Sequence, residues 1–107
     1  MKMKEKVENI LSGFFERNKE YSVNIYIRNG VTDNHIALLL IPVERMIVVK
    51  ETKYILEWDD AQFNNFSLPY EEILDCYEER DGYNSQTVHV IMKNGMKFEF
   101  ECCGLRI

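Results

Sequence analysis

The sequence has no long apolar run, which excludes a membrane-spanning helix. Such a helix needs about 18 or more consecutive apolar residues, and polar or charged residues interrupt every apolar stretch well before that length. The N-terminal segment is not expected to be a signal peptide either, because acidic residues interrupt it and no long apolar run follows it. We therefore expect a cytoplasmic protein.

Metal-binding and catalytic motifs are also missing. The three cysteines and two histidines form no C-x-x-C or H-x-x-x-H pair, the spacings that are typical of zinc ligands. An odd number of cysteines cannot pair completely within one chain, which fits a reducing compartment. There is no G-x-S-x-G nucleophile motif and no glycine-rich phosphate loop. We expect no metal, no cofactor and no enzymatic activity.

Cationic residues are fewer than acidic ones. The chain has 13 Lys and Arg residues and 18 Asp and Glu residues, which gives a net charge of −5. This balance argues against direct binding to nucleic acid, whose phosphates require clustered cations. The acidity is local, because residues 57–81 contain nine carboxylates and one cation, Arg80. Aromatic residues are interleaved with these acids, unlike in a disordered acidic tail, so we expect this segment to fold.

The chain of 107 residues leaves room for one domain, residues 1–107. Its first element is predicted to be an amphipathic helix over residues 3–17 that ends near Asn18. One apolar stripe at helical spacing carries this prediction, and it comprises Met3, Val7, Ile10, Leu11, Phe14 and Phe15.

A sheet is predicted across residues 21–103. Residues 22–28 alternate between apolar and polar and predict a half-buried strand. Residues 35–41 are almost continuously apolar and predict a central strand that is covered on both faces. Residues 45–50 and 53–58 form the next strand pair, and residues 59–68 are expected to be a loop or an irregular crossover.

Residues 70–80 allow two interpretations. Their apolar residues have helical spacing, with Ser67 as a cap and Gly82 as a terminator. Alternatively, residues 69–72 form one tight turn that leads into a strand over residues 73–79. We favour the strand, because it would complete a three-stranded meander with the hairpin that follows.

That hairpin joins residues 87–92 to residues 96–102. A three-residue loop with Gly95 in the left-handed region places Val88 opposite Phe100 and Val90 opposite Phe98. This register gives one apolar and one polar face, whereas a slip by one residue would expose the apolar set. We therefore predict the three-residue loop.

The predicted fold class is α+β, with an N-terminal helix packed on a mostly antiparallel sheet of six to seven strands. The sheet is expected to be strongly bent or to form a half-barrel. Strand pairs followed by L-P-Y-E-E-I and a three-strand meander resemble pleckstrin-homology-like small bacterial domains in architecture. Those domains end in a helix, whereas the last residues here continue a strand.

The acidic segment predicts a surface that docks a basic partner. Crowded like charges repel, and a basic groove would relieve that repulsion and steer association, while Trp and Tyr dominate binding hot spots. By analogy in size and charge, an inhibitor of host nucleic-acid machinery from a phage or mobile element, such as an anti-CRISPR protein, fits this description. We hypothesise a non-catalytic protein-binding domain that contacts neither nucleic acid nor membrane, with the partner-binding residues Trp58, Asp59, Asp60, Tyr70, Glu71, Glu72, Asp75, Glu78 and Glu79.

Three alternatives stay open. The acids could serve only as a solubilising surface. The chain could be a pleckstrin-homology-like small-ligand or lipid-binding module, with its basic cluster drawn from Arg28, Arg45, Lys50 and Lys53. It could also be a self-associating accessory domain that forms a homodimer through an exposed edge strand or through the loop with Phe63 and Phe66.

Overall fold

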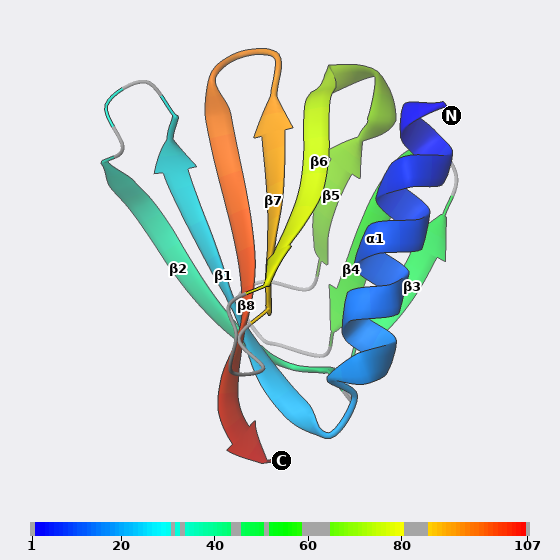
Figure 1. The fold of residues 1–107 in the computed structure, drawn as a ribbon, viewed down its shortest axis with the longest axis vertical. Helices are drawn as coiled ribbons and strands as arrows, with labels where there is room; N and C mark the ends of the chain where they lie inside the picture. Colours follow the sequence, from blue (N-terminus) through cyan, green and yellow to red (C-terminus); the bar gives the residue numbers. More distant parts are fainter. Residues whose placement is uncertain are drawn as a thin grey trace.

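The computed structural model describes residues 2–30, 32, 34–43, 46–50, 52–58, 65–80 and 86–106. These residues form one α-helix, eight strands and one 3-10 turn (Figure 1). The elements are α1 (Met3–Arg17), β1 (Tyr21–Asn29), β2 (His35–Pro42), β3 (Met46–Lys50), β4 (Lys53–Trp58), β5 (Asn65–Pro69), η2 (Tyr70–Glu72), β6 (Ile73–Arg80), β7 (Gln86–Met92) and β8 (Met96–Arg106). The α+β class is confirmed, with an N-terminal helix packed on a mostly antiparallel sheet.

The helix follows the predicted bounds. Its apolar stripe is buried at Val7, Leu11, Phe14 and Phe15. It ends at Arg17, and the capping residue Asn18 donates a hydrogen bond of 2.8 Å from its side-chain amide to the Phe14 carbonyl oxygen and another from its backbone N–H to the same oxygen. These bonds satisfy a carbonyl of the kind that the end of a helix leaves without a partner.

Five strands form sheet A in the order β2-β1-β8-β7-β6, and every pair is antiparallel. The β7–β8 hairpin has the predicted register, with Val88 opposite Phe100 and Val90 opposite Phe98. Its loop turns at Gly95, whose φ of 92° lies in the left-handed region. The prediction of the three-residue loop is confirmed.

The prediction that residues 35–41 form a central strand is wrong. In the described part of the chain, β2 pairs with β1 alone and lies at the edge of sheet A, where Ile36 is 56 % exposed. The other side of β1 is taken by β8, which arrives from the far end of the sequence. A continuous apolar run does not distinguish a central strand from an edge strand, because this choice depends on distant pairings.

Sheet B has the order β3-β4-β5. Its β3–β4 hairpin was predicted, whereas β5 falls mostly within the segment that was expected to be a loop, so the prediction is wrong over residues 65–68. Leu68 on β5 lies opposite Tyr54 on β4, and both side chains are fully buried. The extra strand raises the number of described strands to eight, above the predicted six to seven.

The connection between the sheets decides between the two interpretations of residues 70–80. A single 3-10 turn, η2, leads directly into β6, which confirms the predicted turn and strand.

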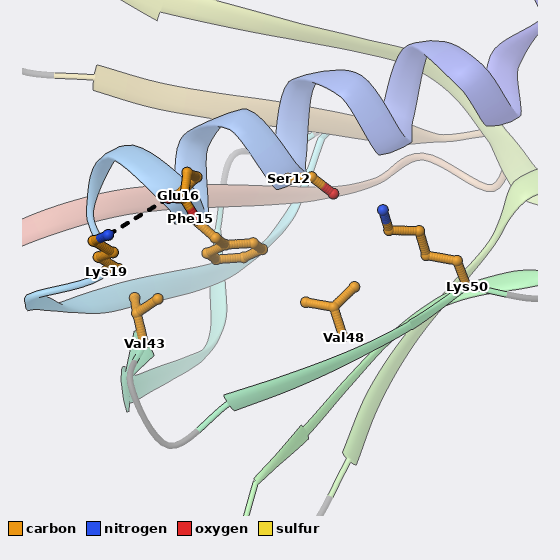
Figure 2. A pocket seen from close by; sticks show the side chains of 7 residues that line it. All are labelled: Ser12, Phe15, Glu16, Lys19, Val43, Val48 and Lys50. Carbon is orange, nitrogen blue, oxygen red and sulfur yellow. Dashed lines mark ion pairs between the residues drawn. The ribbon is translucent and has the colours of Figure 1, made fainter.

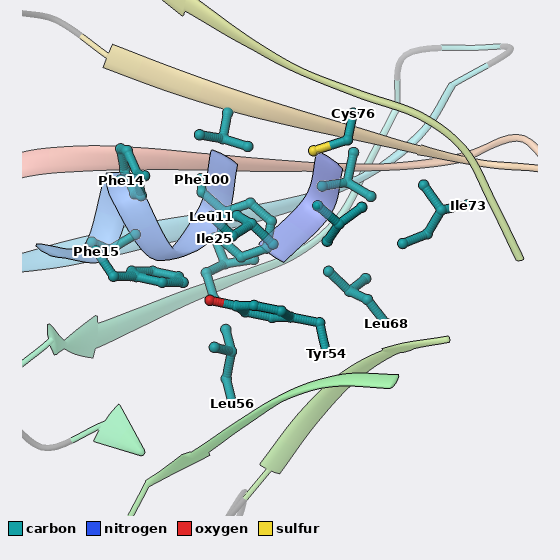
Figure 3. Packing of buried hydrophobic residues seen from close by; sticks show 14 of the residues in the cluster. Leu11, Phe14, Phe15, Ile25, Tyr54, Leu56, Leu68, Ile73, Cys76 and Phe100 are labelled. Atoms are coloured by element: carbon teal, nitrogen blue, oxygen red, sulfur yellow. The ribbon is translucent and has the colours of Figure 1, made fainter. Parts of the chain in front are cut away.

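The core lies between α1 and the inner faces of both sheets (Figure 3). It joins Leu11 and Phe14 of α1, Ile25, Val88, Val90 and Phe100 of sheet A, and Tyr54, Leu56 and Leu68 of sheet B.

Candidate functional site

The predicted partner-binding residues separate along the chain. Trp58 ends β4, while Asp59 and Asp60 lie outside the described residues. The remaining six lie in succession on η2 and β6, and they are Tyr70, Glu71, Glu72, Asp75, Glu78 and Glu79. The alternation of side chains along a strand sends these six to different surroundings.

Tyr70 is buried rather than presented to a partner. Its residue exposure is 7 %, and the Lys4 ammonium lies 5.9 Å from the centroid of its ring. Burial, followed by the nearby Glu8 carboxylate, raises the pKa of the Tyr70 hydroxyl to about 12. Tyr70 therefore helps to hold η2 against α1.

Asp75 and Glu78 are bound to cations of α1. The Asp75 carboxylate accepts a hydrogen bond of 2.8 Å from the Lys6 ammonium. Glu78 pairs with Arg17 of α1 and, at 2.6 Å, with Arg80 of its own strand. The hydrogen bond from Lys6 and then that from the Cys76 backbone N–H lower the pKa of Asp75. These two acids dock the helix on β6, and their charges are partly compensated within the chain.

Glu79 belongs to a cluster on the face of sheet A that points away from α1. Its carboxylate lies 3.0 Å from Nε2 of His89, a neighbour on β7. The His89 ring stacks on Tyr77, with ring centroids 4.7 Å apart and an interplanar angle of 16°. Tyr77 was not among the predicted site residues. Neighbouring side chains on a strand point to opposite faces, so the position of Tyr77 next to the buried Cys76 indicates that Tyr77 faces away from the core.

Two of the three exposed large apolar residues in the described chain lie on β6. Leu74 is 60 % exposed and Tyr77 is 38 % exposed. The exposed carboxylates Glu71, Glu72 and Glu79 lie close to them in sequence on the same turn and strand. We call these five residues the β6 surface. Because β6 is an edge strand of sheet A, this surface combines apolar groups, acids and a strand margin.

The cations suggested for a lipid headgroup site do not converge. Arg28 pairs with Glu99 at 3.2 Å in sheet A. Lys50 lies opposite Tyr54 in the β3–β4 pair and shares the inner face of sheet B, whereas Lys53 falls on the outer face by alternation. Arg45 lies outside the described residues. The described residues therefore offer no cluster of these cations.

A pocket of about 390 Å³ opens between α1 and β3 (Figure 2). Its lining mixes apolar side chains with two lysines, one carboxylate and one hydroxyl. The lining residues are Ser12, Phe15, Glu16, Lys19, Val43, Val48 and Lys50. No local sequence pattern predicts this pocket, because it forms between elements that are brought together only by tertiary packing.

Cys76 is placed where it cannot act as a nucleophile. Its side chain is fully buried, and burial raises the pKa of its thiol to about 12, whereas attack requires the thiolate. Within the described ranges, no three His, Cys, Asp or Glu side chains are grouped so as to hold a metal ion. The same ranges contain no helix with the length and apolar character needed to cross a bilayer.

Comparison of the chain with protein-family models, with curated proteins and with solved structures found no match. A function for the chain has to be inferred from the surfaces and the pocket described above.

Proposed function

We propose that the chain is a non-catalytic protein-binding domain whose β6 surface engages a basic partner. The observation that supports this most directly is the exposure of Leu74 and Tyr77 on an edge strand that also presents exposed carboxylates. Solvated acids alone explain solubility, but they do not explain two large apolar side chains left in water beside them.

Each component of the β6 surface has a distinct part in binding. Glu71 and Glu72 supply charge that attracts cations over long range and accelerates encounter. Tyr77 and Leu74 supply apolar area that becomes buried on contact, and Tyr is enriched among residues that dominate binding energy. As an edge strand, β6 offers backbone donors and acceptors on its open side to an added strand, although the Cys76 N–H already donates to the Asp75 carboxylate.

The partner class follows from the charge. A groove rich in Lys and Arg, such as the nucleic-acid site of another protein, presents the cations that Glu71, Glu72 and Glu79 complement. Occupation of that groove by carboxylates would exclude the phosphates. This is the action of an inhibitor of nucleic-acid machinery from a phage or mobile element, of the anti-CRISPR type.

The test compares two double variants with the same change of charge. Glu71→Lys/Glu72→Lys alters the β6 surface, whereas Glu16→Lys/Glu57→Lys alters exposed acids on α1 and at the far end of β4. We expect the wild type and the second variant to retain a partner in co-purification, and the first variant to lose it. Equal recovery with all three proteins would contradict the proposal.

Competition by DNA or RNA then tests the partner class. If the bound surface is a nucleic-acid groove, adding a duplex should release the complex, and raising the salt concentration should weaken it as the Debye length falls to about 8 Å and below. A complex that resists both treatments would exclude this class of partner.

A further inference from the structure

We propose that the pocket between α1 and β3 binds a small molecule that joins an apolar body to a carboxylate group. The pocket shares no residue with the β6 surface. Its volume of about 390 Å³ lies within the range of roughly 300–1,000 Å³ that is typical of small-ligand sites.

The apolar wall of the pocket consists of Phe15, Val43 and Val48. Phe15 and Val43 are 5 % and 8 % exposed, and Val48 is partly buried against the core. Figure 2 shows these three side chains directed toward the space between the helix and β3. Such side chains favour a ligand body without hydrogen-bonding groups, because polar groups there would find few partners.

Lys50 supplies a cation on the side of sheet B that faces the core. Its cross-strand partner Tyr54 and the next such pair, Val48 and Leu56, place Lys50 on the inner face of β3, and the residues Tyr54 and Leu56 are fully buried. In Figure 2 the Lys50 side chain extends toward Ser12 across the pocket. The other lysine of the lining, Lys19, pairs with Glu16 at 3.6 Å.

No ion pair is formed by Lys50 with any residue that the structure describes. The exposed Lys50 ammonium, at the rim of an apolar wall, is suited to an anionic group. A carboxylate fits, because an ammonium forms a short, charge-assisted hydrogen bond with it.

Ser12 adds a second donor for the same carboxylate. Its hydroxyl oxygen lies 3.1 Å from the Tyr54 hydroxyl oxygen. The Tyr54 phenol is protonated at neutral pH, because its ordinary pKa of 10.0 is already well above 7 and burial raises it to about 12. When Tyr54 donates this proton to the Ser12 oxygen, the Ser12 hydroxyl can donate its own proton to the ligand.

The position of α1 relative to the pocket is set by its contacts with sheet A. The helix packs against β6, β7 and η2, and the pairs Lys6–Asp75 and Arg17–Glu78 fix it on that side. On the side of its second half that faces β3, the residues Ser12, Phe15 and Lys19 line the pocket.

The test uses sodium octanoate as the probe and the methyl NMR signals of Val43 and Val48 as the readout. We expect saturable shifts at these methyl groups in the full chain. Acetate has the charge without the chain, and 1-octanol has the chain without the charge, so both should bind more weakly by about tenfold or more.

Matched variants test the role of Lys50. Lys50→Met keeps most of the apolar stem and removes the charge, and it should weaken octanoate binding by about tenfold. Lys53→Met makes the same change on the outer face of the hairpin and should leave binding within about twofold, since exposed charges at a distance are screened. A folded spectrum with unperturbed methyl signals in the absence of ligand verifies each variant.

Three outcomes would overturn the proposal. The first is the absence of saturable shifts at Val43 and Val48 in the wild type. The second is equal binding of octanoate and 1-octanol, which would exclude a contribution of the carboxylate to affinity. The third is an equal loss of affinity in both lysine variants, which would assign the effect to net charge alone. None of these results depends on the partner proposed for the β6 surface.

Discussion

Burial assigns different tasks to residues that look alike in the sequence. Tyr70 and Tyr77 both stand among acids, yet Tyr70 is 7 % exposed and supports η2, whereas Tyr77 is 38 % exposed and covers His89. Leu11 and Leu74 differ in the same way, as the first is fully buried and the second is 60 % exposed. This contrast between like residues makes matched substitutions informative.

Leu11→Ala is expected to lower the free energy of unfolding by about 2–5 kcal/mol, because it leaves a cavity in the core. Leu74→Ala removes the same atoms from an exposed site and should change that free energy by about 0.5 kcal/mol or less. Urea unfolding measures both. On the proposed function, Leu74→Ala should nevertheless weaken partner binding. Equal destabilisation by the two substitutions would contradict the core position of Leu11.

Cys76 should resist alkylation in the folded protein. Its thiol pKa is raised to about 12 by burial, so little thiolate exists at mildly alkaline pH, and the sulfur is shielded from reagents. In a Cys102→Ser/Cys103→Ser background, we expect labelling only when urea unfolds the chain, at a rate that follows the open population. Rapid labelling in the absence of urea would show that Cys76 is accessible.

Among the elements, those specified by local signals were predicted best. The register of the β7–β8 hairpin followed from the alternation of its strands and from Gly95. β2 and β5 were misassigned, because the edge position of the one and the strand pairing of the other depend on residues far away in sequence. The link between α1 and β6 also had no local signal, since it joins residues such as Lys6 and Asp75.

Gly95→Ala should destabilise the hairpin. The backbone φ of 92° at this position is one that L residues rarely adopt, and the expected loss in the free energy of unfolding is about 1 kcal/mol or more. Gly13→Ala is the contrasting variant, because Ala is favoured over Gly within a helix by up to about 1 kcal/mol. Its new methyl group would meet only the end of the Arg17 side chain, at 3.1 Å. Chemical denaturation distinguishes the two variants. An unchanged free energy of unfolding in Gly95→Ala would argue against a loop that needs the left-handed conformation at this position.

The Lys6–Asp75 pair should make the docking of α1 depend on pH. The folded pKa of Asp75 lies below its ordinary value of 3.8, so its contribution to stability is complete above that value and is lost as the pH falls through the folded pKa. The pKa of Lys6 is raised above 10.5, chiefly by its hydrogen bond to Asp75. Its contribution is therefore complete below 10.5 and is lost as the pH rises through the folded pKa.

We expect Asp75→Asn to destabilise the protein at neutral pH by about 0.5 kcal/mol or less, because the two side chains are 38 % and 45 % exposed and solvent screens the pair. This difference from the wild type should disappear in acid below the folded pKa. Urea titrations across this range measure it, with Lys6→Met and the double variant completing a thermodynamic cycle. Additive effects of the two substitutions would exclude a direct interaction.

For the whole molecule, the sequence supported the fold class but not the arrangement of charge. Periodicity predicted the helix and most strands, because side-chain spacing records which face is buried. The acidic segment could not be resolved in the same way. Asp75 and Glu78 turned out to bind helix cations, while Glu71 and Glu72 stay exposed. Composition gives the sign of the charge on a segment, but only the tertiary structure places the compensating cations.

The position of β8 has a consequence for synthesis of the chain. This strand lies between β1 and β7. One margin of β1 therefore stays unpaired until residues 96–106 are available to pair with it. Until they leave the ribosomal exit tunnel, the nascent polypeptide exposes the apolar strands β1 and β2. We therefore expect sheet A to assemble only after residues 96–106 have left the tunnel, and β1 and β2 to need protection from non-native contacts until then.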